Sequence, residues 1–85
     1  MNHDLRMKAF LEQLVAALAA HPEQGEVRLV DGRRATRFEI HLPAGERGPL
    51  IGKEGSTIKA IRTLAAISAH RHRRRFEVEI AGPGE

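Results

Sequence analysis

Two glycines, at positions 52 and 55, lie inside the string IGKEGSTIKAI, which runs from Ile51 to Ile61. They constrain the fold more than any other feature, because glycine lets the chain reverse sharply and carries no Cβ atom. Isoleucine stands directly before the pair and again three and six residues after it, which is the spacing of a buried helix face. The sequence therefore predicts a tight loop over residues 52–55, followed by a helix that begins at Ser56.

The same loop suits a particular ligand chemistry. Without Cβ atoms at Gly52 and Gly55 another backbone can approach closely, and the free amides at the start of the following helix attract an anion. Lys53 adds a positive charge at the tip. A phosphodiester backbone fits such a surface. However, a bare Gly-x-x-Gly spacing is also typical of an ordinary turn between helices, so the interpretation needs support from the rest of the chain.

Charge is distributed unevenly along the 85 residues. Residues 1–46 carry 6 basic and 7 acidic side chains, whereas residues 47–75 carry 8 basic and 1 acidic. Residues 76–85 add three Glu and bring the net charge to +3. The basic segment indicates a polyanionic partner, most often nucleic acid. A solvated Arg-rich surface is an equal alternative, since 11 of the 14 basic residues are Arg.

Hydrophobic periodicity and turn signals predict the other elements. The first helix begins with Asp4 at its N-cap and stops at His21-Pro22. Asp31-Gly32 marks a hairpin between two strands of alternating polarity. The predicted helices cover 4–20 and 56–70, with a short helical turn within 46–51, and the predicted strands lie around 26–29 and over 36–42 and 76–80.

This order, α-β-β-α-α-β, predicts a single α+β domain with one three-stranded sheet covered on one face by three helices. Residues 4–81 are expected to be ordered and residues 82–85 to form a frayed tail. One face of the second strand is apolar and is expected to meet the helices. On the opposite face we expect cross-strand charge pairs, with Glu39, Glu77 and Glu79 opposite Arg28 and Arg37.

The motif, the basic segment and the element order together resemble the KH domain. IGKEGSTIKAI matches the KH pattern I-G-x-x-G-x-x-I-x-x-I at every fixed position. A helix and a strand precede the βααβ core, so the resemblance is to the prokaryotic type II arrangement. It covers about residues 4–81 and nearly fills the chain, which makes the sequence similar to the small bacterial single-KH RNA-binding proteins of the KhpA family.

The resemblance implies a groove for about four single-stranded nucleotides. The residues implied to clamp the RNA backbone are Gly52, Lys53, Glu54 and Gly55. Flanking contacts are implied for Leu50, Ile51, Ser56, Ile58 and Lys59, with an apolar floor shared by the strand at Phe38–Ile40. The variable loop of the fold falls at residues 31–34, which would place Arg33 and Arg34 on the other side of the groove. Glu54 stands where relatives usually carry a basic or neutral residue, and Pro49 and Ser56 stand where Lys or Arg is common, so each of the three weakens the attraction for phosphate.

Other charged and polar residues carry less specific signals. Two interpretations stay open for the arginines at positions 71, 73, 74 and 75. They form either a secondary RNA patch or a surface that serves solubility alone, and the residues concerned are Arg71, Arg73, Arg74 and Arg75. His70 and His72 fit no metal-ligand set, because arginines flank them and no carboxylate is adjacent. No nucleophile has an orienting base, so we expect neither catalysis, nor a metal, nor a cofactor. With no Trp, no Tyr and 3 Phe, base stacking cannot be the main source of affinity.

The sequence thus predicts a single-stranded RNA-binding protein that acts as an RNA chaperone or post-transcriptional regulator. The resemblance implies pairing with itself or with a second KH-containing protein of the KhpB, or Jag-like, kind, and a part in cell-envelope growth. The alternative is a protein-interaction subunit with a weak or vestigial groove, which dimerises through its alanine-rich helix faces. Without cysteine, a signal peptide or a long apolar segment, the protein is expected in the cytoplasm and not at a membrane.

Overall fold

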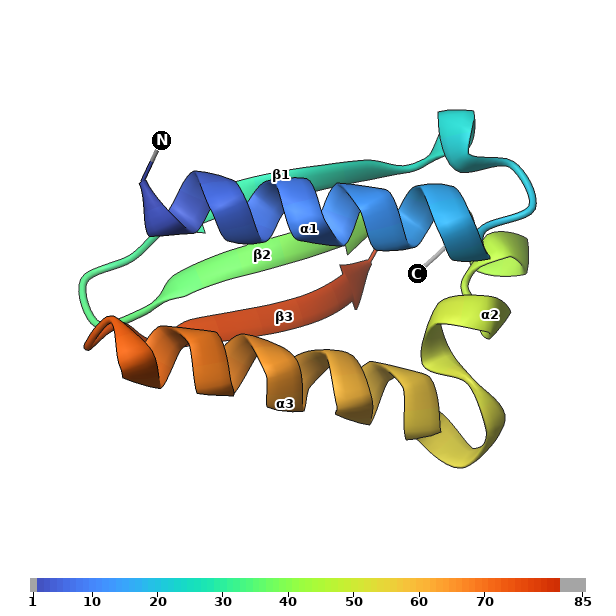
Figure 1. Cartoon of the computed structure of the whole chain (residues 1–85). Helices are drawn as coiled ribbons and strands as arrows, with labels where there is room; N and C mark the ends of the chain where they lie inside the picture. Colours follow the sequence, from blue (N-terminus) through green and yellow to red (C-terminus); the bar gives the residue numbers. More distant parts are fainter. Residues whose placement is uncertain (1, 82–85) are drawn as a thin grey trace.

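The computed structural model describes residues 2–81, which form a three-stranded sheet with helices on one face (Figure 1). The elements are α1 (His3–Leu18), β1 (Glu26–Asp31), β2 (Thr36–His41), α2 (Gly48–Ile51), α3 (Ser56–Arg71) and β3 (Phe76–Ala81). Single 3-10 turns lie at Pro22–Gln24, Ala44–Glu46 and Lys53–Gly55. The predicted α+β class and element order are confirmed. The tail expected to fray, 82–85, lies outside the described residues.

The central strand of the sheet is β2. It pairs antiparallel with β1 and parallel with β3, and Phe38 stands between Leu29 and Val78 in the register. Parallel neighbours need a long crossover connection. Here the crossover runs from residue 42 to residue 75 and holds α2, the glycine loop and α3.

The core lies between the sheet and the two long helices. Thr36, Phe38 and Ile40 alternate along β2 and are buried, as the sequence predicted. The Phe38 and Phe76 rings meet edge to face with their centroids 5.1 Å apart, a favourable geometry for aromatic pairs. The helices contribute residues at three- and four-residue spacing, namely Met7, Leu11 and Val15 from α1 and Ile58, Ile61, Ala65 and Ala69 from α3.

Two helices, not three, cover the sheet. Both α1 and α3 lie across its inner face, whereas α2 is a four-residue turn at one end of the molecule (Figure 1). Gly52, with φ +77°, ends α2 after four residues, and its first turn is formed by Gly48 and Pro49, where proline is well tolerated. Leu50, which follows them, is fully buried and closes that end of the core.

The start of α1 differs from the prediction. Asn2, not Asp4, caps the helix, and its side-chain oxygen accepts a hydrogen bond from the Leu5 N–H at 2.8 Å. Asp4 lies in the first turn and points inward, where it accepts hydrogen bonds from the Thr36 hydroxyl at 3.1 Å and the Arg74 guanidinium at 2.7 Å. Both Asn and Asp suit an N-cap. Asp4 is instead paired with Arg74, seventy residues away, so Asn2 takes the capping position.

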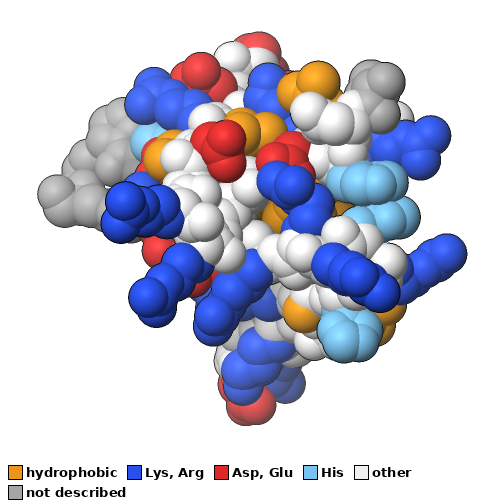
Figure 2. Space-filling model, turned by 90° about the vertical axis from the view of Figure 1, so that its left-hand side faces the viewer, with side chains coloured by type: hydrophobic (Ala, Val, Ile, Leu, Met, Phe, Trp, Pro, Cys, Tyr) orange, Lys and Arg blue, Asp and Glu red, His pale blue; other side chains and the backbone are white. Residues whose placement is uncertain are grey.

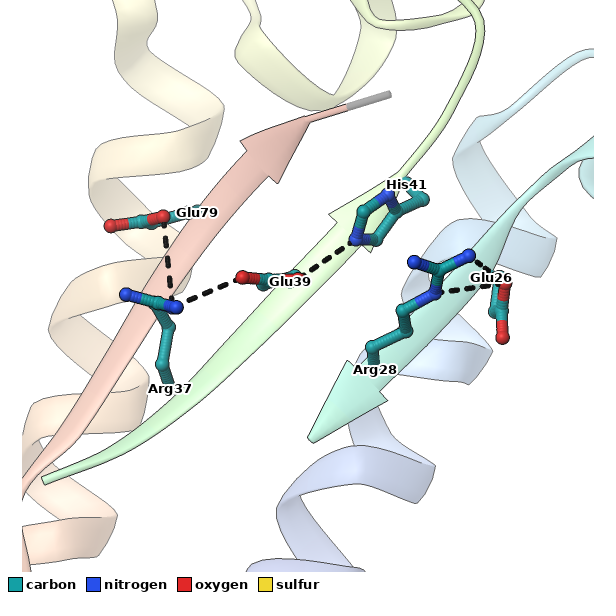
Figure 3. Close-up of polar contacts among 6 residues, drawn as sticks. All are labelled: Glu26, Arg28, Arg37, Glu39, His41 and Glu79. Carbon is teal, nitrogen blue, oxygen red and sulfur yellow. Dashed lines mark hydrogen bonds and ion pairs between the residues drawn. The ribbon is translucent and has the colours of Figure 1, made fainter. Parts of the chain in front are cut away.

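The uncovered face of the sheet carries charged side chains that pair with one another (Figure 3). Arg37 lies 3.1 Å from Glu39 on its own strand and 3.9 Å from Glu79 on β3. The His41 imidazole lies 2.9 Å from the Glu39 carboxylate. This hydrogen bond, together with the nearby Arg37 charge, holds the pKa of Glu39 below its ordinary value.

Cross-strand pairing was therefore predicted correctly for Arg37 and Glu79 but not for Arg28. The Arg28 guanidinium pairs with Glu26 of its own strand at 3.2 Å, because side chains two residues apart share one face of a strand. Glu77 forms no ion pair within residues 2–81. With its arginines already paired to carboxylates, this face offers little to a polyanion.

Candidate nucleic-acid interface

The loop between α2 and α3 is built from left-handed backbone conformations. Gly52, Glu54 and Gly55 have φ values of +77°, +56° and +77°. The Gly55 N–H donates to the Gly52 carbonyl at 3.1 Å, which closes the turn. A positive φ costs glycine little conformational energy and is uncommon for other residues. The sequence-predicted tight loop is confirmed, and Glu54 is its one strained member.

The two glycines serve different purposes. A Cβ atom at Gly52 would collide with the Thr57 side chain and lie 2.8 Å from the Thr57 nitrogen, so Gly52 is needed for packing. A Cβ atom at Gly55 would meet no atom within 4 Å, so Gly55 is needed for its φ and leaves open space outside the loop. Gly55 also stands at the N-cap of α3, where no side chain forms a capping hydrogen bond to the helix amides, although the Ser56 N–H already donates to the Lys53 carbonyl. A ligand backbone can therefore approach those amides.

The charge at this end of the molecule is small. Lys53 and Glu54 are both exposed at the tip, and neither forms an ion pair within the described part of the chain. Ser56 and Lys59 are exposed on the first turn of α3. Because Glu54 offsets one of the two lysines, the loop has a weak positive charge.

The apolar residues beside the loop lie deeper than predicted. Leu50 and Ile58 are 0% and 7% exposed, and they belong to the same core cluster as Phe38 and Ile40. Their burial fixes α2 against α3 and so supports the loop from beneath. They do not form a floor at the surface. Ile51 is 40% exposed, and RNA contact by this residue stays a prediction.

Arg33 and Arg34 lie at the opposite end of the molecule from the glycine loop. Their loop joins β1 to β2, at the end where α3 finishes and β3 begins (Figure 1). The 16 residues of α3 separate the two ends by about 24 Å at 1.5 Å per residue. These arginines therefore do not face the glycine loop across a four-nucleotide groove, because parallel pairing brings the starts of β2 and β3 together at the far end.

The far end instead brings together two basic regions that lie far apart in the sequence, residues 33–34 and residues 71–75. Figure 2 views this end directly and shows Lys and Arg side chains spread across it. A hollow of about 370 Å³ lies among them, and the arginines that line it are Arg33, Arg34, Arg73, Arg74 and Arg75. Arg71 is exposed on the last turn of α3.

Two arginine contacts were missed from the sequence. Arg62 on α3 donates to the Val78 carbonyl at 3.0 Å and so satisfies part of the outer edge of β3. Arg74 pairs with Asp4 at the start of α1. Neither contact has a local sequence signal, since each joins residues far apart in the chain.

No cluster of three or more His, Asp or Glu side chains in residues 2–81 could hold a metal ion. The described helices are all too short or too polar to cross a membrane.

Comparison with known proteins gives a consistent result. A family model described as KhpA/KhpB, KH domain, matches residues 8–80. RNA-binding protein KhpA of Chlamydia muridarum is 40% identical over 74 residues, which cover 87% of this chain and 95% of the relative. The proteins of the same name from Clostridium acetobutylicum and Halalkalibacterium halodurans are 34% and 31% identical over 87% of this chain, covering 99% and 97% of their own lengths. No solved structure matches significantly.

Proposed function

The chain belongs to the KhpA/KhpB family of KH-domain proteins, and on this basis we propose that it binds single-stranded RNA, with the loop at residues 52–55 clamping the RNA backbone. The observation that carries the proposal is the open space outside Gly55, next to helix amides that no side chain caps. Phosphate oxygens are the acceptors that such amides favour. The relatives named RNA-binding protein KhpA support the same ligand.

We further propose that residues 1–85 act as one KH domain that works by binding and not by catalysis. A clamp that holds about four nucleotides, with no aromatic side chain exposed beside it, suits brief contacts with many RNAs. That behaviour fits an RNA chaperone or post-transcriptional regulator in the cytoplasm. Pairing with itself or with a second KH-containing protein of the KhpB kind belongs to the same proposal.

Lys53→Asp tests the clamp. It places two carboxylates at the loop tip, so binding of a short single-stranded RNA should be lost because the phosphates are repelled. Since Lys53 is exposed, the free energy of unfolding should change by no more than about 0.5 kcal/mol. Fluorescence anisotropy with a labelled hexanucleotide measures the affinity, and circular dichroism checks the fold.

Lys8→Asp on α1 is the matched control, because it changes the net charge by the same amount away from the loop. It should leave hexanucleotide affinity within about twofold. Equal losses in both variants would mean that binding follows net charge and not the glycine loop. Unchanged binding by Lys53→Asp would reject the clamp.

A second function, self-association, is favoured by one observation. Leu64 and Ile67 lie on successive turns of α3 and are 52% and 56% exposed, and neighbouring exposed apolar side chains are typical of an interaction surface. The outward faces of both long helices also present alanines. A partner on this face would bury the apolar surface, and RNA binding and pairing would then use different parts of α3.

A further inference from the structure

The strongest concentration of charge in the molecule lies far from the family motif. We call the hollow lined by Arg33, Arg34, Arg73, Arg74 and Arg75 the arginine pocket. Asp4 neutralises Arg74 through an ion pair of 2.7 Å. The other four arginines form no ion pair within residues 2–81, and no acidic residue lines the hollow. The arginine pocket is therefore much more positive than the glycine loop.

Hydrogen bonds hold the two walls of the arginine pocket together. The Thr36 N–H donates to the Arg75 carbonyl at 2.9 Å, which joins the start of β2 to the start of β3. The Arg74 guanidinium also lies 3.3 Å from the Thr36 hydroxyl. On the other wall the Gly32 N–H donates to the Ala35 carbonyl at 3.0 Å. The arginines thus project from backbone whose geometry is fixed before any ligand arrives.

One of these arginines occupies a position where glycine is the usual residue. Arg73 has φ +54°, and the Arg74 N–H donates to the Ala69 carbonyl at 2.8 Å. This is the left-handed ending that commonly carries glycine after a helix. Arginine, with its charge and several hydrogen-bond donors, stands at this position despite the backbone strain. Backbone strain of this kind is often found at functional sites.

We propose that the arginine pocket binds phosphates of the same RNA strand that the glycine loop holds, so that the bound RNA extends along α3. This inference rests on the proposed function. About 24 Å separates the two sites, which roughly 7 nucleotides would span at the 3.4 Å spacing of a stacked strand. No acidic residue occurs in α3, and Lys59, Arg62 and His70 are exposed along it. The helix α3 therefore adds no negative charge to the path, and the acidic side chains nearest to it are Glu77 and Glu79 of β3, beside Arg62.

RNA length separates this arrangement from a single clamp. A hexanucleotide can occupy the glycine loop alone, whereas a 16-nucleotide strand can reach both sites. The double variant Arg33→Ala/Arg34→Ala should leave hexanucleotide affinity within about twofold and lower 16-nucleotide affinity by about tenfold. Its log–log salt slope for the longer RNA should become shallower by about 1.4, since each lost phosphate contact to a single strand contributes about 0.7.

The double variant Lys8→Ala/Arg28→Ala is the matched control, because it removes two positive charges that lie outside both sites. It should bind both RNAs nearly as well as the unaltered protein. A loss for the 16-nucleotide strand equal to that of the arginine pocket variant would reduce the effect to net charge and overturn the proposal.

Arg73→Gly separates binding from stability. Glycine relieves the strain at positive φ, so the melting temperature should rise while 16-nucleotide affinity falls severalfold. Arg73→Lys should keep most of the affinity. If Arg73→Gly binds the longer RNA as well as the unaltered protein, the arginine pocket does not contact it.

Equal weakening of hexanucleotide and 16-nucleotide binding by the arginine pocket variants would also overturn the bridging arrangement. Failure of the unaltered protein to bind the hexanucleotide would count against the proposed function itself.

Discussion

At the scale of single residues, Glu54 is the side chain most out of place in a phosphate clamp. It is exposed at the loop tip and adopts φ +56° without a glycine's freedom. Its carboxylate offsets the charge of Lys53. If the loop binds RNA as proposed, Glu54 opposes the ligand and lowers the affinity for short RNAs.

Glu54→Lys should tighten hexanucleotide binding and steepen the log–log salt slope by about 0.7, the share of one additional phosphate contact. Anisotropy titrations at several salt concentrations measure both quantities. Glu54→Gln removes the negative charge without adding a positive one, so it should give a smaller gain. No gain from either variant would show that the loop tip faces away from the phosphates.

Asp4 joins the N-terminal helix to the last connection of the chain. Its side chain is 11% exposed, whereas that of Arg74 is 41% exposed, so water can replace part of the ion pair. Asp4→Ala should lower the free energy of unfolding by about 1–2 kcal/mol, because Thr36 also loses its acceptor. Urea denaturation measures the change.

The exposed Lys8–Glu12 pair, at 3.7 Å, provides the comparison for Asp4. Glu12→Gln should alter the free energy of unfolding by less than about 0.5 kcal/mol. A similar small change for Asp4→Ala would mean that the inward-pointing carboxylate adds nothing to stability.

At the scale of elements, a pair of stacked imidazoles joins the start of α1 to the end of α3. The rings of His3 and His72 lie parallel with centroids 3.4 Å apart. Desolvation of the His72 ring, and then the positive charges of His3, Arg71 and Arg6, lower the pKa of His72. The stack therefore favours the neutral ring.

This pKa shift gives the stability of the fold a pH dependence of known sign. The unfolded chain binds a proton at His72 more readily than the folded chain, so this stability is fully present above the ordinary His pKa of about 6.5 and is lost as the pH falls from there through the lower pKa of the folded state. His72→Gln should remove part of the difference in urea midpoint between pH 7.5 and pH 5.5. His70→Gln, on the same exposed turn, should not. Equal behaviour of the two variants would exclude the stack as the cause.

Sequence pattern predicted the elements better than their contacts. The alternation in β2 and β3 and the three- and four-residue spacing in α3 each depend on neighbours along the chain, and these elements formed as expected. The N-cap was missed because two suitable residues lie two positions apart and a distant arginine decides between them. Arg33 and Arg34 were misplaced because their position across the groove was taken from the family resemblance, whereas the parallel pairing of β2 and β3 puts their loop at the end of the molecule far from residues 52–55.

At the scale of the whole molecule, positive charge and exposed apolar surface lie in different places. The arginine pocket occupies one end, while Leu64 and Ile67 lie along the outer side of α3. A partner could therefore cover the apolar face without covering the arginines of the β1–β2 loop.

Self-association through this face should appear in sedimentation equilibrium at tens of micromolar protein. Leu64→Glu/Ile67→Glu should yield only monomer, because it places charge where apolar contact is needed. Both residues are more than half exposed, so the circular dichroism spectrum should stay unchanged. A monomer at every concentration of the unaltered protein would remove the homodimer.

The crossover between β2 and β3 also sets the order in which the arginine pocket can assemble during synthesis. The glycine loop lies inside this crossover, and Arg75, on one wall of the arginine pocket, meets Thr36 only when the start of β3 lies beside β2. Pairing between such distant segments closes a long loop and forms late. Because β3 follows the whole crossover along the chain, the two walls of the arginine pocket can meet only after the glycine loop and α3 have been synthesised.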